Sequence, residues 1–222
     1  MQREKLLRDY PLNATLWWLN WFDGRSESAL VQWRGLCQGR DVNALMTAGQ
    51  LINWGMHALA ADMLNALDCQ RTLPLYLQAS LLPKAERGEL VVKAIDAFPQ
   101  FVRFPNTLEE VAALESIEEC WFARHLLACF YYNKCSYNKA ITLWQRCVEM
   151  SPEFADGWRG LAIHAWNKQH DYELAARYLD NAYQLAPQDA RLLFERDLLD
   201  KLSGVTPEKR LARLENNLEI AL

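Results

Sequence analysis

The sequence predicts an all-α fold, in which helical hairpins stack into a right-handed solenoid that forms one continuous domain over residues 1–222. Two neighbouring segments, residues 121–154 and 155–189, repeat one another in the order of their small, aromatic and polar residues. They end close to Pro152 and Pro187, and proline does not continue a helix. A period of about 34 residues made of two helical halves is typical of a solenoid whose repeats pack on their neighbours.

The spacing of the two repeats is nearly constant. Early landmarks advance by 34 residues, as from Leu127 to Leu161, whereas later ones advance by 35, as from Ala140 to Ala175. We therefore expect one extra residue between positions 168 and 172, in a turn, where an insertion costs little stability.

Small and large residues alternate in each repeat as two packed helices require. Four alanines fall where the two helices of a hairpin would touch, namely Ala128, Ala140, Ala162 and Ala175. Small side chains let helix axes approach to about 8–10 Å. Larger residues would fill the space around these contacts, namely Leu127, Trp144, Leu161 and Leu179.

The same residues resemble the tetratricopeptide repeat (TPR) family, whose pattern is W-x2-L-G-x2-Y…A-x3-F…P. The second segment matches it at Trp158, Leu161, Ala162, Ala175, Leu179 and Pro187, and the first at Leu127, Ala128, Tyr131, Ala140, Trp144 and Pro152. Arg124 replaces the expected tryptophan in the first copy, and Ala165 replaces the tyrosine in the second.

Degenerate hairpins are expected before these repeats, over residues 12–37, 41–68 and 73–97. The first would contain an aromatic helix with Trp17, Trp18 and Trp21. We expect an extended aromatic connector over residues 98–105, because its two prolines disfavour helix. Thr107 and Glu110 have the spacing of a capping box that opens the next helix.

A partial repeat is expected over residues 190–222. Arg196 and Asp197 stand where the pattern has Leu-Gly, so either the register shifts or this hairpin is a cap with a polar outer face. Gly204 would end its first helix, and Thr206 with Pro207 would begin the second. The apolar end, residues 220–222, favours the interpretation that the chain is a fragment of a larger protein.

Composition argues against several classes of function. With 24 basic and 28 acidic residues the net charge is −4, which gives no broad attraction to nucleic acid. No apolar run approaches the roughly 18 residues of a membrane helix, and no secretory signal opens the chain. The six cysteines form no C-x-x-C pair, so we expect reduced thiols and a cytoplasmic protein.

The sequence contains no recognised catalytic or phosphate-binding motif. The four histidines have no metal-ligand spacing, and the acidic pairs are adjacent, which is typical of a solvated helix face. We therefore expect no enzyme activity, no cofactor and no metal.

The TPR resemblance implies a concave groove that binds a peptide or a partner helix. Carried over residue by residue, its inward positions are Phe122, His125, Cys129, Tyr132, Asn133, Asp156, Arg159, Ile163, Trp166 and Asn167. Arg159 could pair with a partner's carboxylate. Tyr132 and Trp166 either supply large contact area to a partner or pack against neighbouring repeats. The carboxylate-clamp variant of the family is not matched, because Leu126, Cys129, Gly160 and Ile163 stand at positions where asparagine is needed.

These features predict a non-catalytic scaffold for a protein or peptide partner, or for other domains of the same longer chain, with no nucleic acid and no membrane. One alternative is an accessory segment of a larger enzyme, such as a protein that joins these repeats to a carbohydrate-type β-domain. A third is a homo-oligomer formed through the aromatic helix with Trp17, Trp18 and Trp21.

Overall fold

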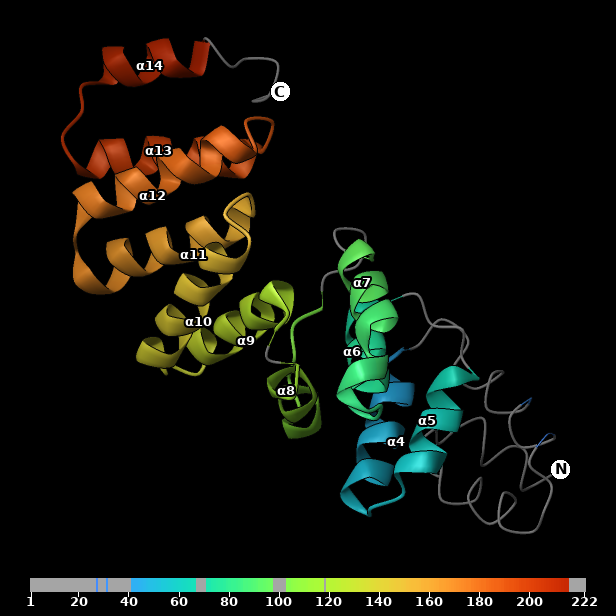
Figure 1. Cartoon of the computed structure of the whole chain (residues 1–222). Helices are drawn as coiled ribbons and strands as arrows, with labels where there is room; N and C mark the ends of the chain where they lie inside the picture. The colour runs from blue at the N-terminus through green and yellow to red at the C-terminus, as the bar shows by residue number, and fades with distance from the viewer. Residues whose placement is uncertain are drawn as a thin grey trace, which may run out of the picture. The chain divides into compact units, whose positions relative to one another are not determined.

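The computed structural model describes residues 27, 31, 41–66, 71–97, 103–117 and 119–215. It divides into two compact units, Met1–Glu118 and Glu119–Leu222, and each is considered by itself. Within the described residues every regular element is a helix (Figure 1). None of these described helices has the length and apolar character needed to cross a membrane.

The first unit is built around one buried helix. Its described helices are α4 (Asp41–Asn53), α5 (His57–Asn65), α6 (Thr72–Ser80), the 3-10 turn η2 (Lys84–Glu86), α7 (Gly88–Asp96) and α8 (Leu108–Glu115). Helix α6 contacts α4, α5, α7 and α8. Tyr76 and its neighbours from Thr72 to Ala79 are all buried, as expected of a helix that is covered on every side.

The capping box predicted at the start of α8 is confirmed. The Thr107 hydroxyl accepts from the Glu110 backbone N–H, and the Glu110 carboxylate accepts from the Thr107 backbone N–H at 3.2 Å. The same carboxylate accepts from the Asn106 backbone N–H at 2.8 Å. These bonds satisfy backbone donors that the first turn of a helix leaves without partners.

The second unit consists of antiparallel hairpins in chain order. Its helices are α9 (Trp121–Asn133), α10 (Tyr137–Met150), α11 (Ala155–His164), the π turn η3 (Ala165–Gln169), α12 (Tyr172–Leu185), α13 (Ala190–Leu202) and α14 (Pro207–Glu215). Each helix packs against the next, as Figure 1 shows from yellow-green to red. The predicted all-α fold of TPR-like hairpins is confirmed for the described residues.

The predicted alanine contacts lie at the centres of the first two hairpins. Ala128 and Ala140 are fully buried beside Trp144 and Leu161. Ala162 and Ala175 belong to the next cluster. Small side chains at these places let the two helices of each hairpin approach closely.

A π turn accommodates the extra residue of the second repeat. In the first hairpin the Ser136 N–H donates to the Tyr131 carbonyl, five residues back. In the second, the Asp171 N–H donates to the Ala165 carbonyl, six residues back. The insertion therefore widens the end of the helix over Ala165–Gln169 before His170, whose φ is 54°, reverses the chain.

The third hairpin keeps the repeat register but replaces the alanine contact with charge. Asp197 and Arg210 each lie 35 residues beyond Ala162 and Ala175. The Arg210 guanidinium donates to both carboxylate oxygens of Asp197, at 2.9 and 2.6 Å. This contact favours an unshifted register for residues 190–222, while the alternative of a cap with a polar outer face stays a prediction.

Several predictions fall outside the described residues. These are the hairpin at 12–37 with Trp17, Trp18 and Trp21, residues 98–102 of the aromatic connector, and residues 216–222. The single continuous domain over residues 1–222 stays a prediction.

Candidate functional site

The ten residues predicted to line a groove all lie in the second unit, on α9, α11 and η3. Phe122 and His125 are buried. Their rings stack with centroids 6.0 Å apart, and the Phe154 ring lies edge-on 5.0 Å from the His125 ring. These two residues therefore support the hairpin from within and present almost no surface to a partner.

Cys129 lies beside His125 as a neutral pair. The Cys129 Sγ is 3.6 Å from the His125 Nε2. Burial raises the pKa of the Cys129 thiol to about 12, and the nearby Asp156 carboxylate adds to this. Burial lowers the pKa of His125 to about 4, where the Asp156 charge opposes the shift and the Arg159 charge adds to it. A nucleophilic cysteine needs a lowered pKa, whereas the pKa of Cys129 is raised, so its thiol stays protonated.

Tyr132 is partly buried and packs against aromatic rings of α10. Its ring lies 5.4 Å from the Trp144 ring and 5.1 Å from the Tyr137 ring, measured between centroids. The neighbouring Asn133 and Asn167 are exposed. Tyr132 thus packs on rings of its own repeat and, with centroids 6.3 Å apart, on His164 of the next repeat. Its contact with a partner stays a prediction, and the amides beside it are exposed.

Asp156 and Arg159 of α11 are already paired with α13. The Arg191 Nη2 donates to the Asp156 Oδ1 at 2.8 Å. The Arg159 Nη2 donates to the Glu195 Oε1 at 2.5 Å, and its Nε donates to Oε2 at 2.9 Å. Such bidentate pairs are among the stronger charge contacts in proteins. A partner's carboxylate could bind Arg159 only by displacing Glu195.

Ile163 of α11 and Trp166 of η3 are the apolar residues that follow Asp156 and Arg159 in the predicted groove set. Both are partly buried, and Trp166 packs on the core formed by α11, α12 and α13. For Trp166 the two alternatives are thus compatible, since one part of its ring system packs inward and the remainder stays accessible.

Helix α13 adds three residues that the sequence reasoning missed. Phe194, Leu198 and Leu202 lie 35 residues beyond Arg159, Ile163 and Asn167, so the repeat spacing itself would have identified them. Phe194 is 64% exposed and Leu202 is 52% exposed. Because residues three and four apart share a side of a helix, these three lie in a row next to Glu195.

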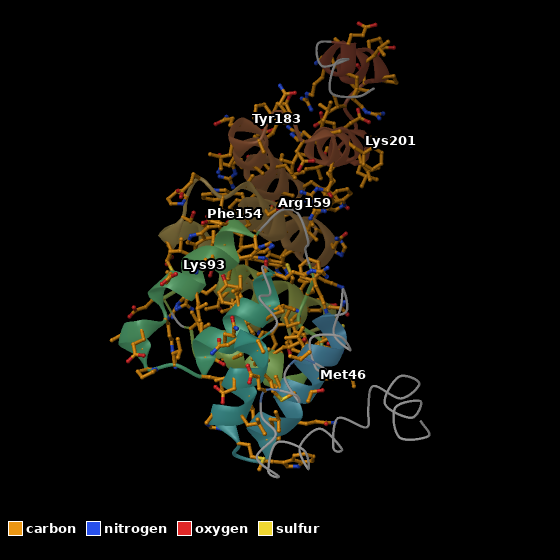
Figure 2. All side chains as sticks on the ribbon, turned by 90° about the vertical axis from the view of Figure 1, so that its right-hand side faces the viewer. Met46, Lys93, Phe154, Arg159, Tyr183 and Lys201 are labelled. Carbon is orange, nitrogen blue, oxygen red and sulfur yellow. The ribbon has the colours of Figure 1, made fainter. Side chains whose placement is uncertain are left out.

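We call this side of α11, η3 and α13 the first-helix face. It consists of Asp156, Arg159, Ile163, Trp166, Arg191, Phe194, Glu195, Leu198 and Leu202. Figure 2 labels Arg159 of α11 and Lys201 near the end of α13. The face combines two interhelical ion pairs with an apolar row that is exposed at Phe194 and Leu202 and partly buried at Leu198.

Among the described residues, no group of three or more His, Cys, Asp or Glu side chains is placed so that it could hold a metal ion. His164 is buried in α11, whereas His170 is exposed in the turn that follows η3.

No protein-family model matches the chain. Among solved structures it is similar to residues 41 to the end of MamA from Desulfovibrio magneticus RS-1, at 14% identity and a TM-score of 0.42, covering 80% of this chain and 90% of that chain. YrrB, described as a TPR protein with an unusual peptide-binding site, matches at 18% identity and a TM-score of 0.41, with 82% and 89% covered. A structure of MamA AMB-1 matches at 14% and 0.45, with 81% and 98% covered. At such scores the fold assignment rests on the helix pairing and repeat spacing of the chain itself.

Proposed function

We propose that this chain is a non-catalytic binding scaffold that holds a protein or peptide partner on the first-helix face. The observation that carries the proposal is the row formed by Phe194, Leu198 and Leu202. Phe194 is 64% exposed, and Leu202, eight residues further along the same helix, is 52% exposed, so covering this apolar surface would be favourable. Clustered exposed apolar residues are typical of interaction sites.

The charges around this row favour an apolar contact at its centre. Arg159 is paired with Glu195, and Arg191 is shared between Asp156 and Asp189. These residues form a polar edge in which each arginine already has a carboxylate partner. Interfaces commonly combine an apolar centre with such a polar rim, so the partner segment should present apolar side chains to Phe194 and Trp166.

The exposed amides at one end of the unit suit an extended peptide backbone. Asn133 and Asn167 each offer both a donor and an acceptor. They lie where the first helices of two consecutive hairpins end. A peptide that crosses the helices could bond to them while its side chains contact the apolar row.

The Cys129–His125 pair does not favour an enzyme. Its thiol keeps its proton well above neutral pH and its imidazole is uncharged, so neither is prepared for nucleophilic or acid–base chemistry. The proposal therefore assigns the second unit to recognition.

The experiment is quantitative affinity capture of the native partner with matched variants. Phe194→Ala should reduce recovery of the partner by about tenfold or more, since aromatic anchors commonly contribute more than 1.4 kcal/mol to an interface. Tyr172→Ala is the control, because Tyr172 is an aromatic residue of α12 that is 37% exposed and lies outside the first-helix face. Equal recovery with both variants would refute this assignment of the surface.

A further inference from the structure

A polar cluster lies where the first two hairpins of the second unit turn. It consists of Tyr132, Tyr137, His164 and Lys168, and we call it the turn-end cluster. We propose that this cluster binds an acidic side chain of the partner segment that lies on the first-helix face. The inference rests on the proposed function and adds one chemical feature of the partner, a glutamate or aspartate next to its apolar anchor.

The extra residue of the second repeat places a lysine over an aromatic ring of the first. Lys168 belongs to the π turn η3, and its Nζ lies 4.5 Å from the centroid of the Tyr137 ring. The Tyr137 hydroxyl beside it raises the pKa of Lys168, so the ammonium stays charged. The centroid of the His164 ring lies 6.3 Å from those of both Tyr132 and Tyr137. The ends of α9 and α11 and the start of α10 therefore meet at one place.

Two buried polar atoms of the cluster lack hydrogen bonds. His164 is 7% exposed, and its Nδ1 has no hydrogen-bond partner among the described residues. The Tyr132 Oη is buried and makes no well-aligned hydrogen bond. Burial raises the pKa of Tyr132, and the Asn167 amide lies near enough to oppose this rise. Buried polar groups are nearly always hydrogen-bonded in native proteins, so these two atoms point to a polar group of a ligand.

The charge of Lys168 identifies that group as an anion. Residues 130–140 and 163–170 contain no Asp or Glu. The next acid along the chain, Asp171, accepts from the Leu174 backbone N–H at 2.9 Å and caps α12. Burial and the Lys168 charge lower the pKa of His164, so its ring is neutral at pH 7 and can donate from Nδ1. One ammonium with two neutral donors suits a single carboxylate.

The amides beside the cluster favour a side-chain carboxylate over the carboxylate of a chain end. Asn133 precedes the first turn, Asn167 lies in the second, and both are exposed. A peptide backbone that bonds to both amides passes across the cluster and continues in both directions. The residue between these two contacts can then place its side chain against Lys168.

The test titrates three alanine-based pentapeptides into the full-length chain labelled with ¹⁵N and ¹³C. The first has capped ends and a central glutamate, the second has capped ends and a central glutamine, and the third has a central glutamine and a free C-terminal carboxylate. We expect the glutamate peptide to bind with a dissociation constant on the order of 1 mM. It should shift the ring signals of Tyr132 and His164 in nuclear magnetic resonance spectra.

The other two peptides test charge and its source. The glutamine peptide should give no saturable shifts, and the peptide with the free C-terminal carboxylate should bind more weakly than the glutamate peptide. Absence of shifts with glutamate, equal binding of glutamate and glutamine, or tighter binding of the free carboxylate would each overturn the proposal.

Conservative variants assign the binding to the cluster. Lys168→Gln should weaken the glutamate peptide about fivefold, the upper range for an exposed ion pair. Lys139→Gln is the matched control, because the Lys139 Nζ lies 4.8 Å from the centroid of the Tyr131 ring, outside the cluster. Tyr132→Phe removes only the hydroxyl and should also weaken the peptide. Equal effects of Lys168→Gln and Lys139→Gln would contradict the assignment.

Capture of the native partner separates a failure of this inference from a failure of the proposed function. Lys168→Gln should lower recovery of the partner severalfold, whereas Lys139→Gln should not. If Phe194→Ala lowers recovery and Lys168→Gln does not, the acidic anchor is wrong and the proposed function stands. If neither variant lowers recovery, both are wrong.

Discussion

Gly160 of α11 offers a sharp test of how two hairpins pack together. A Cβ atom added at this glycine would lie 2.3 Å from Trp144 Cε2 and 2.6 Å from its Cδ2 and Nε1. Trp144 is buried in α10, and Tyr132 packs against its ring. The ring can therefore not swing away as the end of a flexible side chain would. We predict that Gly160→Ala destabilises the protein.

Two opposing effects set the magnitude. Replacing glycine by alanine inside a helix ordinarily stabilises it by roughly 0.8–1 kcal/mol. Inserting a methyl group into a filled core costs roughly 1–3 kcal/mol, and an overlap with a rigid ring belongs in the upper half of that range. The expected net effect is a decrease of about 1–2 kcal/mol in the free energy of unfolding.

The assay is urea unfolding followed by circular dichroism, with hydrogen exchange to localise the change to α10 and α11. Gly88→Ala is the control, because a Cβ at this first residue of α7 meets no atom within 4 Å. It should leave stability unchanged or raise it slightly. Trp144→Leu should make room, so that Gly160→Ala costs much less in that background.

Two results would refute this reasoning. The first is a Gly160→Ala variant as stable as the unmodified chain. The second is an equal cost of Gly160→Ala with Trp144 and with leucine at position 144, because coupled neighbours should give a clear interaction energy in such a cycle.

Three further predictions concern titratable and charged groups of the second unit. Burial holds the pKa of His125 near 4, below the roughly 6.5 of an unfolded chain, so the free energy of unfolding should fall between pH 6.5 and pH 4 by on the order of 3 kcal/mol at most. In urea unfolding at several pH values, the free energy of unfolding should depend less on pH in His125→Phe, and an equal dependence would contradict the assignment. Cys135 is exposed whereas Cys147 is buried with its pKa raised to about 12, so peptide mapping after brief iodoacetamide treatment should find Cys135 alkylated far ahead of Cys147. Arg159→Glu should lower the melting temperature by placing two carboxylates together, and adding Glu195→Arg should restore much of it; absence of rescue would speak against the pair.

The alanine contacts could be predicted because they leave a periodic signal. Ala128 with Ala140 and Ala162 with Ala175 recur at nearly the same offsets, and only small residues fit where two helices touch. The position of the insertion was also visible in the spacing. Its form, a π turn over Ala165–Gln169, was not, since it depends on which carbonyl the Asp171 N–H reaches.

The charge contacts of the site could not be read from local sequence. Arg159 and Glu195 are 36 residues apart, and their pairing follows only from the register of α13 against α11. Arg196 and Asp197 obscured that register, because they replace the pattern residues of the third repeat. When the spacing of 35 residues is kept across Arg196 and Asp197, Phe194 of the third repeat aligns with Arg159 of the second.

The burial of Phe122 and His125 could not be derived from the repeat pattern. Both occupy positions that face a ligand in the TPR family, yet here the Phe154 ring packs against both. Phe154 precedes α11 and belongs to no repeating pattern. Two of the ten positions carried over from the family are therefore covered by an aromatic side chain of a connecting segment, while the binding role of the set stays a prediction.

The most direct test of the central claim is photo-crosslinking from the first-helix face in the native setting. A photoreactive phenylalanine analogue at position 194 should give one defined adduct with a partner protein, and the same analogue at position 172 of α12 should not. If position 172 crosslinks as strongly as position 194, or if the partner co-purifies while position 194 gives no adduct, the first-helix face is not the binding surface.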